Sequence, residues 1–210
     1  MFFSTYFSKQ ARKPSGLFGR FFMSQVFEKG NAELNTLVYD TMSVEPDDHV
    51  MEIGCGTGWL ISRIAKKMNT GKIEGIDFSR AMVSAAKRKN RTWIRNGIVR
   101  LHQGDFDTAE FETGGFDKIF SVNTVYFWKH PKTVISRVCR LLKPEGRLFI
   151  GFHHKQDMEQ KPLNRDVFQY YSPQDVTDLL SLEASVKDIE IVSRKGKQMP
   201  GYCAVAVTKR

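Results

Sequence analysis

The sequence predicts an α/β fold with a doubly wound, mostly parallel, seven-stranded sheet of the Rossmann-like type and an N-terminal helical cap. Three observations support this fold class. Short apolar runs alternate with amphipathic helical segments, one of these runs turns into a helix through closely spaced glycines, and others end in polar residues. At 210 residues the chain suits one well-buried domain. We expect a helical arm or lid over residues 1–44 and the sheet domain over 45–210.

The N-terminal part is basic and aromatic. Residues 1–26 hold no acidic side chain, and their Lys and Arg residues alternate with Phe and Tyr. No continuous apolar segment follows, which argues against a secretory signal, whereas a transit peptide or a membrane-surface arm stays open. We favour a short amphipathic helix over residues 17–30 that closes over the substrate side of a pocket. Asn31 is positioned to cap a second helix.

The first strand ends in a glycine-rich turn. Residues 50–53 are apolar except for Glu52, and Gly54, Gly56 and Gly58 follow at alternate positions. Because glycine has no Cβ, a ligand can lie against bare backbone at the start of the next helix. The dinucleotide fingerprint needs a glycine where this chain has Trp59, and a Walker A lysine is missing. A small polar cofactor without phosphate is therefore favoured.

Each later strand also ends in polar residues. Strand two covers 73–77 and ends in Asp77, which comes 23 residues after Gly54, a spacing typical of a ribose-binding acid. Ser79 is expected to cap the following helix. Strand three covers 99–105, and strand four, 116–122, is followed by Asn123. Ligands of open α/β sheets bind beyond such carboxyl ends.

The remaining elements complete the sheet. A helix over 134–142 precedes strand five at 147–151. Ser172, Pro173 and Asp175 mark the start of another helix. Two strands, 186–192 and 202–208, close the domain.

Three motifs resemble one family. Glu52 followed by Gly-x-Gly-x-Gly resembles motif I of the class I S-adenosylmethionine-dependent methyltransferases, Gly104-Asp105-Phe106 resembles their third motif, and the Leu-Lys-Pro-x-Gly-x-Leu run that begins at Leu142 recurs in them. The likeness is specific from about 50 to 151 and concerns only topology afterwards. It implies a methyltransferase that uses S-adenosyl-L-methionine. The implied cofactor-binding residues are Glu52, Gly54, Cys55, Gly56, Gly58, Asp77, Phe78, Asp105, Phe106 and Asn123.

The resemblance also assigns roles. Asp77 accepts hydrogen bonds from the ribose, Phe78 lies beside the adenine, Asp105 accepts from the adenine amino group and Phe106 packs on the ring. Methyl transfer is an in-line displacement, in which positioning can dominate and a base is not always needed. His130 is the catalytic base candidate, with His153 and His154 as others. Tyr126, together with Trp128, either surrounds the sulfonium by cation–π attraction or belongs to the core.

The acceptor is expected to be a small molecule, since no separate recognition domain follows strand five. Position 123 has Asn, but Thr124 and Val125 replace the prolines of the motif that amino-methylating relatives carry. Two alternatives are a methyltransferase acting on RNA or phospholipid and a non-catalytic S-adenosylmethionine-binding protein. A monomer or homodimer is expected.

Charge and cysteine usage bear on partners and compartment. The net charge is +9, and residues 61–100 carry eleven basic and two acidic residues. Nucleic acid or an anionic membrane surface is one interpretation, but a solvated helix face is favoured. The three cysteines are far apart and fit neither a disulfide framework nor a zinc knuckle, which favours the reducing cytoplasm. The histidines and acids after residue 152 lack metal-ligand spacing, so no metal site is predicted.

Overall fold

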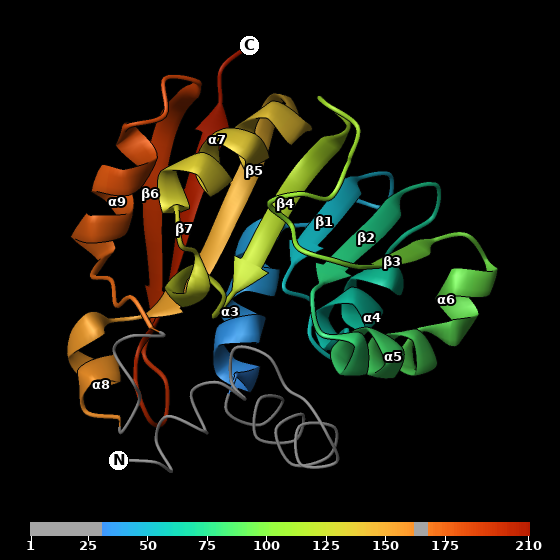
Figure 1. The fold of residues 1–210 in the computed structure, drawn as a ribbon, viewed down its shortest axis with the longest axis horizontal. Helices are drawn as coiled ribbons and strands as arrows, with labels where there is room; N and C mark the ends of the chain where they lie inside the picture. The colour runs from blue at the N-terminus through green and yellow to red at the C-terminus, as the bar shows by residue number, and fades with distance from the viewer. Residues whose placement is uncertain (1–30, 162–167) are drawn as a thin grey trace.

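A computed structural model describes residues 31–161 and 168–210 of the protein. Its centre is one seven-stranded sheet in the order β3-β2-β1-β4-β5-β7-β6 (Figure 1). The strands are β1 His49–Ile53, β2 Lys72–Asp77, β3 Val99–Gln103, β4 Phe116–Val122, β5 Leu142–His153, β6 Val186–Arg194 and β7 Gly201–Thr208. The helices are α3 Ala32–Met42, α4 Trp59–Ala65, α5 Arg80–Lys89, α6 Arg91–Arg95, the 3-10 turn η1 Val125–Phe127, α7 Pro131–Leu141, α8 Lys155–Glu159 and α9 Pro173–Ser181.

The sheet is mixed, which refines the prediction of a mostly parallel one. Strands β3, β2, β1, β4 and β5 pair in parallel, and β7 pairs antiparallel with both β5 and β6. Only a short connection joins β6 to β7, and such a connection allows only antiparallel pairing, because a parallel pair needs a long crossover. The two closing strands expected from the sequence are therefore one hairpin.

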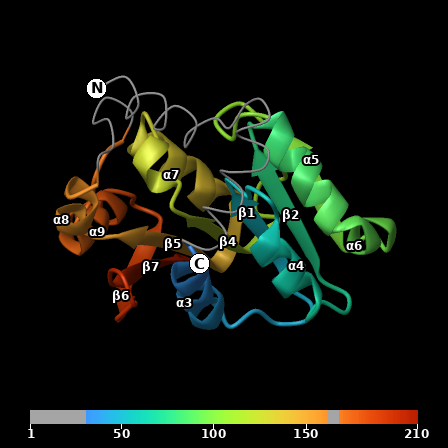
Figure 2. The same ribbon diagram turned by 90° about the horizontal axis from the view of Figure 1, so that it is seen from below.

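Helices cover both faces of the sheet. In Figure 2, α3 and α7 lie on opposite faces. Buried side chains of α3, α4 and α5 form one hydrophobic core with the sheet, and those of α7 and α9 form a second core on the other face. Central strands such as β1 are buried on both faces, which explains their continuous apolar runs.

Two helix starts follow the sequence signals. The Ser79 hydroxyl accepts a hydrogen bond from the Met82 N–H at 3.5 Å at the start of α5. At the start of α9, Ser172 and Asp175 exchange hydrogen bonds in a complete capping box. Both predictions are confirmed.

The expected N-terminal arm falls into two parts. Its helix over 17–30 lies outside the described residues. The second helix is α3, which packs on the sheet against β5 and β7 as one of its covering helices. Within the described ranges, no helix combines the length and apolarity that crossing a membrane requires.

The order of the strands determines where a crevice forms. From β1 the chain builds outward through β2 to β3 and then returns to β4 on the other side of β1. The connections that follow β1 and β4 therefore leave in opposite directions, which opens a space at the carboxyl ends of these strands.

Candidate functional site

A cavity of about 330 Å³ lies at this switch point. It is bounded by the carboxyl ends of β1, β2, β3 and β4 and by the loop that contains η1. Its lining residues are Asn31, Ile53, Gly54, Gly56, Ile76, Asp77, Phe78, Met82, Gly104, Asp105, Phe106, Asp107, Val122, Asn123, Thr124, Phe127, Trp128, Lys129 and Val134. The sequence-predicted acids and the aromatic loop thus meet in one place.

The glycines of the turn have different structural roles. Gly56 has φ +51° and lines the cavity, and a Cβ there would meet no atom within 4 Å. A ligand can therefore approach its backbone. Gly58 is different, because a Cβ would lie 2.7 Å from Asn90 Nδ2 and 2.9 Å from Ala86 Cβ. Gly58 allows α4 to pack against α5 and is not among the lining residues, so its contact with a ligand stays a prediction.

Asp77 joins the turn to β2. Its Oδ2 accepts the Gly56 N–H at 3.0 Å, and its Oδ1 accepts the Ser79 N–H at 2.8 Å. Burial raises the pKa of Asp77, and these two backbone hydrogen bonds act against that rise. A carboxylate offers about four acceptor positions, so Asp77 can also receive hydroxyl groups from a ligand in the cavity that it lines.

Glu52 and Cys55 lie behind the lining. Both are buried and neither is among the residues that line the cavity, so their contact with the ligand stays a prediction. Burial raises the pKa of the Glu52 carboxyl well above its ordinary value, and the neighbouring Asp77 raises it further. Glu52 Oε2 has no hydrogen-bond partner in the described part of the chain. The Cys55 side chain packs in the core beneath α4.

One end of the cavity presents an aromatic and acidic surface. Phe78, Asp105 and Phe106 all line it, and their predicted roles in cofactor binding stay predictions. Asp105 is exposed, and its Oδ1 accepts the Asp107 N–H at 3.1 Å. The Phe106 ring is buried, with the Arg137 guanidinium 5.3 Å from its centroid.

Asn123 contacts a residue from far away in the chain. Its Nδ2 donates to Asn31 Oδ1 at 2.7 Å, a hydrogen bond between positions 92 residues apart. Asn123 has φ 56°, in the left-handed region that Asn tolerates. In the described chain, Asn123 Oδ1 and Thr124 Oγ1 are buried without hydrogen-bond partners. These atoms can serve an amino or hydroxyl group of a ligand.

Asn31 was not predicted as a site residue, whereas Thr124 belongs to the stretch from Asn123 to His130 that was expected to face the reacting centre. Asn31 stands at the cap position of α3 but makes no capping hydrogen bond with its side chain. Its side chain instead reaches the end of β4, a contact that no local spacing signals.

The two catalytic candidates lie outside the lining. The Tyr126 side chain is fully buried, and its hydroxyl accepts the His153 backbone N–H at 2.6 Å. Its two neighbours, Phe127 and Trp128, do line the cavity. His130 is exposed at the start of α7. The arrangement therefore places Tyr126 in the core and His130 at the surface, and gives neither a contact with the cavity.

The polar groups of the cavity favour a ligand without phosphate. Its described lining has three carboxylates, Asp77, Asp105 and Asp107, and one cation, Lys129. Carboxylates repel phosphate but accept hydrogen bonds from hydroxyl and amino groups. The side chains present thus fit an adenosyl amino acid, whose ribose, adenine and ammonium groups are all donors. Within the described chain, no group of three or more His, Cys, Asp or Glu side chains is arranged so that it could hold a metal ion.

The fold and site define a doubly wound α/β protein that binds a nucleoside-containing ligand at its switch point. The Methyltransferase domain family matches residues 50–146. The uncharacterized methyltransferase YdaC of Bacillus subtilis is 27% identical over 84% of this chain and 92% of its own length. The demethylmenaquinone methyltransferase of Oceanobacillus iheyensis is 32% identical over 51% of this chain and 45% of its own.

A solved structure agrees at the level of fold. A SAM-dependent methyltransferase from Aquifex aeolicus superposes with a TM-score of 0.70 at 19% identity, over 88% of this chain and 95% of its own. The domain match and these likenesses together indicate an S-adenosylmethionine-dependent methyltransferase, with S-adenosylmethionine as the cofactor.

Proposed function

We propose that the protein transfers the methyl group of S-adenosylmethionine to a small-molecule acceptor. The observation that carries this proposal is the wall of the cavity beyond Asn123, which Phe127, Trp128 and Val134 form. This wall is concave and apolar, and such a wall suits a small molecule better than a polymer. The relative named for demethylmenaquinone lends support, because its name specifies a small-molecule acceptor.

The cofactor-binding roles form part of the same proposal. Asp77 accepts the ribose hydroxyls, Asp105 accepts from the adenine amino group, and the ring lies between Phe78 and Phe106. The open backbone at Gly56 faces the methionyl part. The unpartnered oxygens of Asn123 and Thr124 receive its ammonium group. Their burial without partners supports this assignment, because buried polar atoms are normally hydrogen-bonded.

Positioning supplies most of the catalysis in this proposal. The bound cofactor supplies an activated methyl group and a neutral leaving group. Aromatic side chains at the cavity wall exclude water and orient the acceptor for attack in line with the bond that breaks. Tyr126 and His130 remain catalytic hypotheses that the geometry does not favour, since the Tyr126 hydroxyl is engaged with His153 and His130 is exposed.

The test combines donor binding with turnover. We expect S-adenosylhomocysteine to bind the wild-type protein in calorimetry and the Asp77→Asn variant to bind it about ten- to a hundredfold more weakly, as loss of a charged hydrogen bond predicts. The exposed Asp188 on β6 provides the control, and Asp188→Asn should bind like wild type. Equal binding by both variants would remove the ribose assignment.

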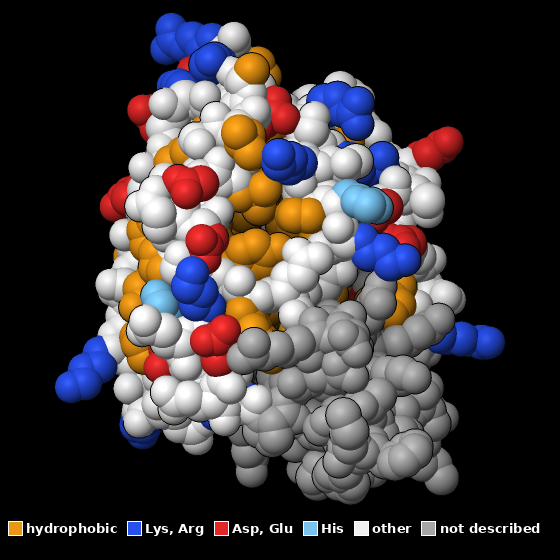
Figure 3. Space-filling view, turned by 60° about the vertical axis from the view of Figure 1, so that its left-hand side comes forward, with side chains coloured by type: hydrophobic (Ala, Val, Ile, Leu, Met, Phe, Trp, Pro, Cys, Tyr) orange, Lys and Arg blue, Asp and Glu red, His pale blue; other side chains and the backbone are white. Residues whose placement is uncertain are grey.

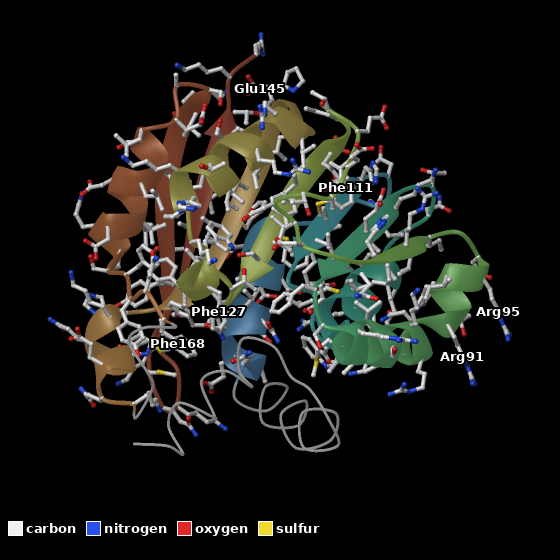
Figure 4. The ribbon with its side chains drawn as sticks, viewed as in Figure 1. Arg91, Arg95, Phe111, Phe127, Glu145 and Phe168 are labelled. Atoms are coloured by element: carbon white, nitrogen blue, oxygen red, sulfur yellow. The ribbon has the colours of Figure 1, made fainter. Side chains whose placement is uncertain are left out.

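The acceptor class is tested by methyl transfer from labelled donor to fractionated small molecules, RNA and anionic vesicles. Label in the small-molecule fraction alone supports the proposal, and label in RNA or lipid contradicts it. The alternative rests on the basic side chains Lys87, Arg88, Lys89, Arg91 and Arg95, which are exposed on α5 and α6. Arg91 and Arg95 point away from the body of the molecule in Figure 4. A solvated helix face explains these exposed charges without nucleic acid or a membrane surface.

A further inference from the structure

A second cavity, of about 270 Å³, lies beside α3. It is enclosed by the first turns of α3, the end of β5 and the turn between β6 and β7. Its lining residues are Ala32, Glu33, Leu34, Thr36, Leu37, His153, Arg194, Lys195, Gly196, Met199 and Gly201. No residue of this set borders the cofactor cavity, so the two spaces are distinct.

His153 is the polar group inside this cavity. It is 6% exposed, and its Nδ1 lies 2.9 Å from the Pro200 carbonyl oxygen. A carbonyl can only accept, so Nδ1 carries the proton. Burial lowers the pKa of His153, although the hydrogen bond to Pro200 acts in the opposite direction. The ring is therefore neutral near pH 7, with an unprotonated Nε2.

Nε2 has no donor. The atom is buried, and no group in the described chain lies within hydrogen-bond reach of it. Other polar groups of the lining are already engaged. The Thr36 hydroxyl donates to the Ala32 carbonyl at 2.8 Å, and Glu33 Oε2 accepts the Lys197 N–H at 2.9 Å. His153 Nε2 is thus a buried acceptor without a donor, in a ring that Pro200 holds in place and that lines the cavity.

The rest of the cavity selects against charge. Leu34, Leu37 and Met199 supply hydrophobic wall. The lining also contains two cations, Arg194 and Lys195, and one carboxylate, Glu33. Arg194 pairs at 2.9 Å with Asp40, which lies outside the lining, so that one further described charge of each sign remains. A neutral ligand suits this balance.

We propose that this cavity is a second small-molecule site, which binds a neutral, mostly apolar molecule through a hydroxyl group that donates to His153 Nε2. Figure 3 shows that the surface carrying α8 and α9 also has a hollow lined by hydrophobic side chains. The His153 cavity is preferred because it contains a buried acceptor without a hydrogen-bond partner.

The first test uses hexan-1-ol as the probe and its isomer methyl pentyl ether as the matched compound without a donor. In full-length protein with 15N-labelled histidine and saturating S-adenosylhomocysteine, the His153 ring should show a proton on Nδ1 only. Hexan-1-ol should shift the Nε2 resonance saturably, and the ether should not. An Nε2 that already carries a proton without probe, or that responds equally to both compounds, overturns the proposal.

Two variants separate the acceptor from the structural role of His153. In His153→Asn, the side-chain amide can keep a donor near the Pro200 carbonyl but places no acceptor at the Nε2 position. Hexan-1-ol binding should therefore weaken about tenfold, the effect of one neutral hydrogen bond. In His153→Gln, an amide oxygen can reach the Nε2 position, which should restore binding. Unchanged affinity in His153→Asn contradicts the proposal. The wild-type spectra decide the question if either variant fails to fold.

Discussion

The buried carboxyl of Glu52 has a consequence for stability. Its pKa in the folded protein is raised well above the ordinary 4.5 by burial and then by Asp77. A group with a raised folded pKa stabilises the fold below its unfolded pKa, and this contribution is lost as the pH rises through the folded value. Glu52 therefore makes the wild-type protein less stable with increasing pH.

We expect Glu52→Gln to remove this dependence. The free energy of unfolding of the variant, relative to wild type, should rise with pH above about 4.5 by at most about 1.4 kcal/mol per pH unit. Denaturant unfolding between pH 4.5 and 8 measures the difference. The exposed Glu112 provides the control, and Glu112→Gln should give a flat difference. A flat difference for Glu52→Gln as well would contradict the pKa assignment.

Single residues of the site were predictable where a local pattern marks them. Asp77, Asp105 and Phe106 each follow a strand in a spacing that the sequence displays, and all line the cavity. Tyr126 was not separable from Phe127 and Trp128, because neighbouring aromatic residues give no sign of which one turns inward. The contact of Asn31 with Asn123 joins positions 92 residues apart, and only tertiary packing creates it.

At the scale of elements, the glycine turn links cofactor binding to helix packing. We expect Gly58→Ala to destabilise the protein by about 2–4 kcal/mol, from left-handed strain of about 1–2 kcal/mol and overpacking against Ala86 and Asn90. Gly97 has φ +74° with no atom within 4 Å of an added Cβ, so Gly97→Ala measures the strain alone. Urea unfolding compares them, and equal losses would contradict the packing role.

The same substitution at Gly56 should act on binding. Gly56→Ala has strain without overpacking, so its stability should match that of Gly97→Ala. Its Cβ would enter the cofactor cavity, and S-adenosylhomocysteine should bind more weakly in calorimetry. Unchanged affinity would show that the ligand does not approach this backbone.

Three adjacent strands share one charged cluster. Glu74 on β2 contacts His49 Nε2 at 3.1 Å and His102 Nε2 at 2.5 Å, which joins it to β1 and β3. Burial tends to raise the pKa of Glu74, but the hydrogen bonds from His102 and His49 outweigh it and lower the pKa to about 2. A depressed folded pKa stabilises the protein above the unfolded value of 4.5, and the contribution disappears as the pH falls toward about 2.

Glu74→Gln should therefore reduce stability at pH 6 and have progressively less effect between about pH 4.5 and 2. Thermal unfolding at several pH values measures this trend. Glu110→Gln, at an exposed position in the loop before β4, is the control and should change little. A loss that stays constant down to pH 2 would contradict the role of the ionised carboxylate.

Helices with capping residues were easier to predict than strand directions. Ser79 and Ser172 mark helix starts because their hydroxyls satisfy free backbone N–H groups nearby in sequence. The direction of β7 depends on its pairing with β5, about 55 residues away, and a single apolar run carries no information on direction.

At the scale of the whole molecule, cofactor binding should stabilise the described domain as a unit. S-adenosylhomocysteine at a hundredfold excess over its dissociation constant should add about 2.7 kcal/mol, or about 5–11 °C in Tm for a chain of this size. A thermal shift assay measures this effect. Asp77→Asn should show a smaller shift at the same concentration, and an equal shift would contradict its part in binding.

The architecture as a whole was predictable because several signals agree. The alternation of apolar and amphipathic segments, the glycine turn and the acids after strands all favour a doubly wound sheet with a site at its carboxyl edge. The second cavity was not predictable. It depends on α3, β5 and the β6–β7 turn meeting in space, and His153 differs from other histidines only through its surroundings.

A single peptide unit separates the two ligand spaces. Asn31 belongs to the wall of one, and Ala32, its neighbour in the chain, belongs to the wall of the other. Any occupant that displaces this unit must alter affinity in both chambers. Thermodynamic reciprocity then fixes the size of the effect. If one ligand changes the dissociation constant of the other by some factor, the second ligand changes that of the first by the same factor.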